Sequence, residues 1–427
     1  MKKYFILAAA ALVALTACTK METTETAEKK ISFEVANYSA QTKAEEPVSV
    51  LTEIGVAGFK TKAWLHANGG SGSNFFGTSD NGYTETITYN GSNAWEPALE
   101  YFWPKASTSY INFVSWFAKN DKAPKSSTLS ETVMEWGDNT NPLTILPSDN
   151  ILFADEAWKQ TDNNTTPTTP YYHKDGVTQG VPTLFHHALA SVAFSVRLST
   201  QTASTKSIWD VTIDAASLTV GNNGYLTLSN SEPTGKSTRA WRIGSTYQES
   251  ESTLATSANV GWARPTSGAS TETIVQTGGT GTVEFATPAF TGFQPTTATS
   301  SAPATSGDYV TLLPPRTVMP QVINGGVVTF SLTFTIKIFH DNDSNGVKDE
   351  FDGTSGITDG DAFSRETITV SDNLYSLVNS ISAWNMNTKY TYRITIDPVG
   401  QKVLFDPAVA DWANVANGEY TGTQVYP

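Results

Sequence analysis

An acidic segment that begins at residue 341 has the residue types and spacing of a calcium-binding loop. Its oxygen-bearing residues alternate with other residues and are followed by Gly346, as in the pattern D-x-[DN]-x-[DN]-G. Calcium accepts about six to eight hard oxygen ligands in a flexible shell, whereas zinc favours His and Cys. The predicted ligands are Asp341, Asp343, Asn345, Val347 (through its carbonyl oxygen), Asp349 and Asp352.

Three features separate this loop from an EF-hand. Its last ligand is Asp352 where Glu is usual, Lys348 stands where an apolar residue is usual, and no amphipathic helix flanks the loop. The alternating segment Thr335–Phe339 enters the loop, so the neighbouring element is predicted to be a strand. Two interpretations stay open: a structural calcium loop on a β-hairpin, or an Asp- and Asn-rich turn that needs no ion.

The sequence contains no recognisable catalytic constellation. The motifs of serine hydrolases, HExxH metalloproteases, P-loop enzymes and dinucleotide-binding proteins are all missing. His186 and His187 are adjacent, but on a strand they point to opposite faces and cannot hold one metal ion together. We therefore predict that the protein is not an enzyme, and that His186 or His187 is a hydrogen-bonded core or interface residue.

The only cysteine, Cys18, lies where a bacterial lipoprotein carries its lipid. Lys2 and Lys3 precede an apolar stretch, residues 4–14, which is too short to span a bilayer of about 30 Å permanently. Leu-Thr-Ala then precedes Cys18, which is similar to the lipobox whose cysteine becomes the acylated N-terminus. We predict a lipoprotein signal peptide over residues 1–17, a polar tether over residues 18–30 and a diacylglycerol and acyl anchor on Cys18. The alternative is an ordinary secretory signal followed by an unrelated cysteine.

The composition favours an exported, β-rich protein. Charged residues make up 16% of the 427 residues, below the roughly 25% usual in soluble domains. Asp and Glu exceed Lys and Arg by 41 to 27, which gives a formal net charge of −14. Because the chain has no basic stripe to neutralise phosphates, nucleic acid is not an expected partner. A single cysteine also excludes a disulfide framework.

Period-2 alternation of apolar residues predicts strands along most of the chain. Clear examples are Ile31–Val35 and Val327–Phe339, and Tyr110–Ala118 is predicted as a further strand between Gly, Asn and Ser turns. The apolar run Phe185–Leu198 is predicted to be one central strand, and Asn373–Trp384 is the helical candidate. Many short strands divided by turns indicate an all-β protein built from β-sandwiches, in which most tryptophans fill the core.

Four groups of residues, taken in order, match the motifs of one known family. They are Leu51–Phe59; Trp95 with Tyr101–Pro104 and Ile111–Phe117; Phe185–Phe194; and Trp384, Tyr390–Tyr392, Ile394–Ile396, Val403–Phe405 and Val409–Trp412. On these residues the chain resembles the fimbrillin family of Bacteroidetes, which includes the Mfa-like and FimA-like subunits of type V pili. Together with the segment around Cys18, the motifs cover most of the chain.

The resemblance implies a fold and a location. The fold is two tandem transthyretin-like β-sandwich domains after the lipoprotein signal peptide, over residues 31–200 and 201–427. The location is the cell surface or a fimbrium, with the chain held in the outer membrane by the lipid on Cys18.

The resemblance also implies a way of assembling. In FimA-like subunits a protease removes an N-terminal strand and opens a groove, which a strand from a neighbouring fimbrial subunit then fills. Here the removed strand would be Ile31–Tyr38 and the cut would follow Lys43, where arginine is more usual; Lys43 as an ordinary solvated loop residue is the alternative. The C-terminal tail, Asn417–Pro427, is the candidate donor segment, although its alternation is poor.

Two functions are therefore expected from the sequence. The first is a surface-exposed fimbrial subunit that assembles by strand exchange and mediates adhesion. The alternative is a surface lipoprotein that does not polymerise and binds glycans or proteins of a host.

Overall fold

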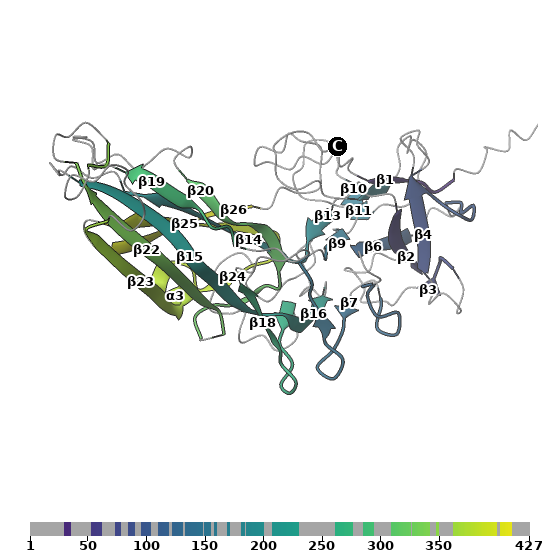
Figure 1. The fold of residues 1–427 in the computed structure, drawn as a ribbon. Helices are drawn as coiled ribbons and strands as arrows, with labels where there is room; N and C mark the ends of the chain where they lie inside the picture. Colours follow the sequence, from purple (N-terminus) through teal and green to yellow (C-terminus); the bar gives the residue numbers. More distant parts are fainter. Residues whose placement is uncertain are drawn as a thin grey trace, which may run out of the picture.

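A computed structural model describes the strands of the protein and the turns close to them. The described residues are 30–35, 53–61, 73–77, 84–89, 95–103, 110–118, 122–130, 133–147, 149–154, 158–159, 169–170, 181–183, 185–199, 207–229, 261–275, 285–293, 309–325, 327–341, 347–349, 362–398 and 402–411. Among them the chain is almost entirely β-strand, with one short helix, α3 (Leu374–Val378) (Figure 1). The predicted all-β fold is confirmed.

The first half of the chain forms a nine-stranded sheet, in the order β12-β1-β5-β4-β2-β6-β9-β13, with β3 paired to β2. Its strands are β1 (Phe33–Val35), β2 (Glu53–Thr61), β3 (Ser73–Asn74), β4 (Thr84–Tyr89), β5 (Trp95–Pro97), β6 (Tyr110–Ala118), β9 (Ile151–Ala154), β12 (Val181–Thr183) and β13 (Phe185–His187). All neighbours in this sheet run antiparallel except β1 and β12, which are parallel. The predicted strand Tyr110–Ala118 is β6, with the same bounds.

The second half of the chain forms two sheets that face each other. One sheet has the order β20-β14-β25-β26, and the other has the order β18-β15-β22-β23, with β19 paired to β15. The strands are β14 (Ala190–Leu198), β15 (Ser207–Gly221), β18 (Thr271–Val275), β19 (Ala289–Phe293), β20 (Val310–Val318), β22 (Thr329–His340), β23 (Ser364–Asn373), β25 (Thr388–Asp397) and β26 (Lys402–Asp411). Because each strand alternates inward and outward side chains, the two inner faces together make one sandwich core.

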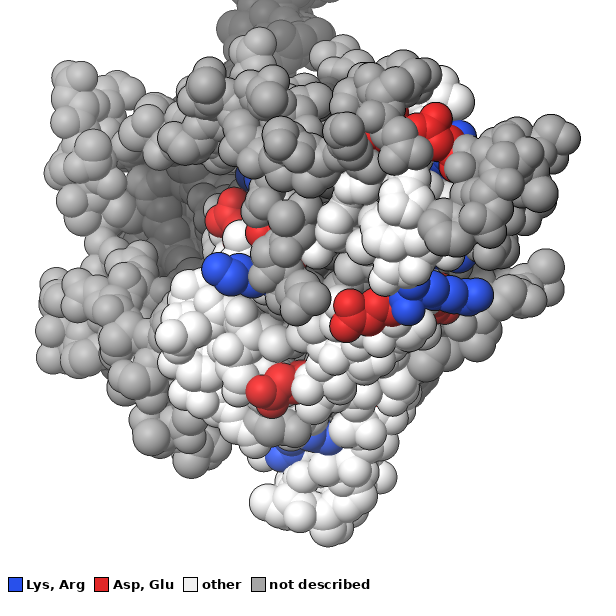
Figure 2. All heavy atoms as spheres, turned by 60° about the vertical axis from the view of Figure 1, so that its left-hand side comes forward, with Lys and Arg blue, Asp and Glu red and all other residues white. Residues whose placement is uncertain are grey.

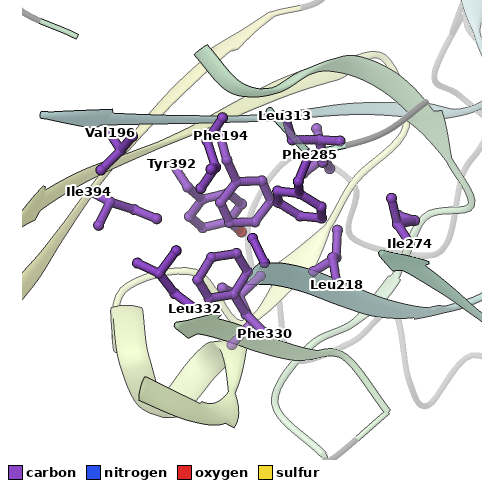
Figure 3. Close-up of a cluster of buried hydrophobic side chains, with 14 of the residues drawn as sticks. Phe194, Val196, Leu218, Ile274, Phe285, Leu313, Phe330, Leu332, Tyr392 and Ile394 are labelled. Carbon is purple, nitrogen blue, oxygen red and sulfur yellow. The ribbon is translucent and has the colours of Figure 1, made fainter. Parts of the chain in front are cut away.

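Three aromatic rings join the two sheets of this sandwich (Figure 3). Phe194 of β14 stacks on Phe330 of β22, with ring centroids 4.8 Å apart and an interplanar angle of 4°. Phe194 also stacks on Tyr392 of β25 at 4.8 Å. Burial raises the pKa of the Tyr392 hydroxyl, which accepts a hydrogen bond from Trp384 Nε1 at 2.8 Å. Stacked rings of this kind add specific contact energy to the area that they bury.

A smaller sheet combines strands from both halves of the chain. β16 (Asn223–Ser229) pairs with β7 (Val133–Trp136), β8 (Leu143–Thr144) and β17 (Gly261–Ala263). A third core lies against it, and its buried members come from widely separated segments, including Trp116, Trp136, Leu226 and Met386. Two short pairs complete the described strands: β10 (Trp158–Lys159) with β11 (Thr169–Pro170), and β21 (Gln321–Val322) with β24 (Ala383–Trp384).

The prediction of one strand over Phe185–Leu198 is wrong. The segment contains two strands, β13 in the nine-stranded sheet and β14 in the C-terminal sandwich. The chain crosses between them at Ala188 and Leu189, which are fully buried in the third core. The crossing residues are apolar, like the inward residues of both strands, so alternation gave no sign of the crossing. The predicted boundary between residues 200 and 201 thus falls after β14, and the division into domains stays a prediction.

Two other sequence predictions can be compared with the described residues. The helical candidate Asn373–Trp384 is helical only in α3, which ends at Asn379 in the left-handed conformation (φ 51°). The described tryptophans support the prediction that most of them fill the core: Trp95, Trp103, Trp116, Trp136 and Trp384 are buried, and Trp209 and Trp262 are partly buried against a core.

Replacing Phe330 by alanine should destabilise the C-terminal sandwich by about 3–5 kcal/mol, because the change removes a buried ring and leaves a cavity between the sheets. Chemical denaturation of the two proteins measures the difference. Phe363→Ala is the matched control, since Phe363 is 47% exposed and should cost far less. Equal losses from the two variants would contradict this description of the core.

Candidate functional site

Strand β1 lies inside the nine-stranded sheet, with described partners on both sides. It pairs in parallel with β12 over three residues, and Val181 N donates to Ser32 O at 2.7 Å. On its other side it pairs with β5 through Phe33 and Trp95, and Ile31 N donates to Tyr101 O at 2.8 Å. Within the described part of the chain, β12 pairs with no strand other than β1. A chain without β1 would therefore have an open slot between β5 and β12, which we call the β1 slot.

The floor of the β1 slot is aromatic. Ile31 and Phe33 are both only 2% exposed, and they belong to the N-terminal core. The Phe33 ring meets Phe113 edge-on at 5.2 Å and tilts toward Phe76 at 6.3 Å. The remaining buried members of this core are Ile87, Trp95, Trp103, Ile111, Leu152, Ala154, Val181 and Phe185. Removing β1 would thus expose a large apolar surface to water.

Tyr101 fixes one wall of the slot. Its backbone carbonyl accepts the hydrogen bond from Ile31, and its hydroxyl donates to Glu85 Oε2 at 2.7 Å and accepts from Gly77 N at 3.1 Å. Burial is the main cause that raises the pKa of the Tyr101 hydroxyl, and the neighbouring Glu85 carboxylate raises it further. The Tyr101 ring also packs on Phe76 at 4.5 Å. Tyr101 therefore joins the edge of the slot to its floor.

The ion pair at the start of β1 contributes little to holding this strand in the sheet. Lys30 forms an ion pair with Glu100, and both side chains are more than half exposed. Exposed ion pairs of this kind contribute about 0–1 kcal/mol. The slot is therefore held mainly by apolar burial and by backbone hydrogen bonds.

The predicted calcium loop is described only in part. Asp343, Asn345 and Asp352 lie outside the described residues, whereas Asp341, Val347 and Asp349 are described. Asp341 is 1% exposed at the end of β22, and Asp349 N donates to His340 O at 2.8 Å. Among the described residues no three acidic, His or Cys side chains gather closely enough to hold a metal ion. The calcium site stays a prediction.

Lys348 contacts two residues outside the predicted loop. Its ammonium group lies 2.5 Å from Asp210 Oδ2 on β15 and 3.9 Å from the centre of the Phe339 ring. A lysine at this position of the loop therefore need not compete with a bound cation. The donor set fits calcium in kind, because the described members Asp341 and Asp349 offer carboxylate oxygens and Val347 offers a carbonyl oxygen.

Other predicted site residues lie outside the described part of the chain. These are Cys18, Lys43 and the tail Asn417–Pro427. No helix within the described segments is both long enough and apolar enough to cross a membrane. His187 is described, and its buried Nδ1 lies 3.2 Å from Asn150 Oδ1, as predicted for a hydrogen-bonded core histidine.

The sequence did not predict which residues line the β1 slot. Tyr101 is a motif residue, but its hydrogen bond with Ile31 joins positions about 70 residues apart. The parallel pairing with Val181 joins residues that are about 150 positions apart. No local pattern carries such information, because alternation shows that a strand has an inner face without showing its neighbour.

Comparison with known proteins found similarity in structure only. No protein-family model and no curated protein matches the chain. One similar solved structure is a fimbrial protein from Bacteroides vulgatus, with 16% identity and a TM-score of 0.40, covering 90% of this chain and 99% of that one. Another is a "putative cell adhesion protein" from Bacteroides uniformis, with 12% identity and a TM-score of 0.36, covering 90% and 98%.

A third similar structure, also named as a cell adhesion protein, comes from Parabacteroides distasonis. It has 10% identity and a TM-score of 0.37, and the match covers 92% of this chain and 99% of that one. The names of these structures are consistent with the fimbrillin resemblance of the motifs. At such low identities and TM-scores they establish no function for this chain.

Calcium should raise the melting temperature of the protein if the loop from Asp341 to Asp352 binds it. The reason is that bound ions stabilise the folded state by mass action and relieve repulsion between crowded carboxylates. Scanning calorimetry with millimolar calcium and then with excess chelator measures the effect. Asp343→Asn should reduce the shift, and Asp372→Asn on β23 is the control. An unchanged melting temperature in calcium and in chelator would remove the site.

Proposed function

We propose that the protein is a surface-exposed fimbrial subunit that assembles by donor-strand exchange and takes part in adhesion. It is exported as a lipoprotein, anchored in the outer membrane through acylated Cys18, and released for assembly by cleavage after Lys43. Its partners are other fimbrial subunits, and it has no enzymatic role. The observation that carries the proposal is the position of β1, buried between β5 and β12 and yet close to the N-terminal end of the chain.

The surroundings of β1 support exchange of this strand rather than simple loss of it. Burying a side chain such as Ile31 or Phe33 contributes about 1.5–3 kcal/mol each. A whole domain is stable by only about 5–15 kcal/mol. A subunit cleaved after Lys43 that released β1 would therefore be poorly stable until another strand entered the slot. This requirement couples cleavage to assembly.

The slot also sets conditions on the strand that enters. To restore the present hydrogen bonds it must run parallel to β12 and antiparallel to β5. It must place apolar side chains at alternate positions, where Ile31 and Phe33 now lie. The tail Asn417–Pro427 is a candidate, with Tyr420 and Tyr426 in one alternating phase.

Cleavage with a trypsin-like protease should convert the purified protein into a ladder of oligomers that resists SDS without boiling. The physical reason is that an inserted strand is held by a full set of backbone hydrogen bonds and by buried side chains. Electrophoresis of boiled and unboiled samples measures the ladder, and N-terminal sequencing of the product should begin at Ala44.

Lys43→Gln is the variant that tests the cut, and Lys20→Gln in the predicted tether is its matched control. The first should remain uncut and monomeric, while the second should behave as the wild-type protein. A wild-type protein that is cut after Lys43 and stays monomeric would disprove the assembling subunit. Filaments that persist on cells after deletion of the gene would disprove it as well.

A further inference from the structure

The outer face of the sheet β20-β14-β25-β26 carries basic side chains that strand exchange does not use. Val196 of β14 and Ile394 of β25 point into the sandwich core (Figure 3). Since side chains alternate along a strand, their neighbours Arg197 and Arg393 lie on the outer face. The register confirms that they are close, because Arg197 lies beside Thr395 and Arg393 lies beside Ser195.

The two guanidinium groups lie near one aromatic ring, and Arg197 also donates a hydrogen bond to a threonine hydroxyl. Arg197 Cζ lies 4.7 Å from the centre of the Tyr309 ring, and Arg393 Cζ lies 5.7 Å from the same centre. Arg197 Nε donates to Thr395 Oγ1 at 3.0 Å. The forks of both arginines are thus partly ordered before any ligand arrives, which lowers the entropic cost of binding.

Carboxylates of the described residues also lie on the strands that carry or neighbour Arg393. Asp406 is the residue across from Arg393 on β26, and Asp397 lies further along β25, where it accepts a hydrogen bond from Ser199 Oγ at 3.2 Å. Within the described residues, neither Arg197 nor Arg393 forms an ion pair. Lys389 and Lys402 lie on the same face by the same alternation. This face is therefore basic in a chain whose formal net charge is −14.

The opposite sheet of the sandwich has a different outer face. Its hydroxyl groups bond to each other across β22 and β23, as in Thr333 with Thr369 at 3.0 Å and Thr335 with Thr367 at 2.9 Å. This face also carries basic side chains, since Lys337 of β22 is paired with Arg365 of β23. In the view of Figure 2, Lys, Arg, Asp and Glu side chains are scattered among uncharged residues wherever the surface is described. The β14 face differs by the Tyr309 ring, which lies near both of its arginines.

We propose that Arg197, Arg393 and Tyr309 form a binding site for the carboxylate groups of an acidic polysaccharide, such as a polymer of uronic acid. The planar forks of arginine match the two oxygens of a carboxylate. Thr391, on the same outer face of β25, offers a neighbouring hydroxyl group that can hydrogen-bond to a sugar hydroxyl. Charge complementarity favours an anionic polymer over a neutral one.

This site is independent of the β1 slot, because it lies on the C-terminal sandwich and needs no cleavage. A protein that failed to assemble could still bind the polysaccharide, and a protein that assembled could fail to bind. The two proposals therefore fail separately.

Binding of the uncleaved protein to polygalacturonate tests the proposal, with affinity measured by calorimetry at low ionic strength. The variant Arg197→Gln/Arg393→Gln should bind at least about tenfold more weakly, because it loses both forks. Arg393→Lys should fall between the two, because an ammonium group keeps the charge without the fork. The control Arg365→Gln, on the outer face of β23, should bind as the wild-type protein does.

Several outcomes would overturn the proposal. The wild-type protein could fail to bind polygalacturonate, or the double variant could bind it as tightly as the wild-type protein does. Arg365→Gln could also lose as much affinity as the double variant. Equal affinity for neutral dextran would also overturn it, because the carboxylates would then be irrelevant. Equal affinity for poly-glutamate or single-stranded DNA would point to an acidic peptide or to nonspecific polyanion binding instead. Circular dichroism melts of every variant establish that a loss of binding is not a loss of folding.

Discussion

The stacking of Phe194 between Phe330 and Tyr392 is the interaction on which the C-terminal half depends. Phe194 belongs to β14, which pairs in parallel with β25 and antiparallel with β20. Phe330 belongs to the facing sheet, so the same ring ties the two layers together. The inner face of β14 thus fixes which residues appear on its outer face. Arg197 lies beside Thr395 and Tyr309 only because Val196 and Phe194 are committed to the core.

One segment of the chain contributes to all three cores. Phe185 is buried in the N-terminal core, Leu189 in the third core and Phe194 in the sandwich. A segment that passes from one core to the next carries apolar residues along most of its length, since Phe185, Leu189 and Phe194 each lie in a different core. This physical constraint explains both the sequence of the segment and the failure of alternation to divide it into two strands.

Local sequence patterns predicted where strands lie better than they predicted which strands pair. The apolar run Tyr110–Ala118 gave β6 with its bounds, although this strand is buried on both faces: Ile111 and Phe113 lie in the N-terminal core, and Val114 and Trp116 lie in the third core. The need for glycine at position 55 is explained only by strand pairing, because a Cβ atom there would lie 2.4 Å from Trp116 Cε2 on the neighbouring strand β6. The partners of β1 and the arginines around Tyr309 join residues far apart in the sequence, so no local pattern could have predicted them.

The small size of β1 is what makes a replaceable strand physically reasonable. β1 has three residues, so its backbone pairing is short. Its burial is nevertheless deep, because Phe33 and the preceding Ile31 belong to the N-terminal core with its aromatic rings. Such a strand leaves slowly while it is tied to the chain, because the released side chains would face water and the slot would lie open. A cut in the following segment removes the tether, and a second strand with matching alternation can then occupy the same positions. In our proposal the specificity of assembly therefore comes mainly from the shape of the aromatic floor, and the exposed pair of Lys30 and Glu100 adds little to it.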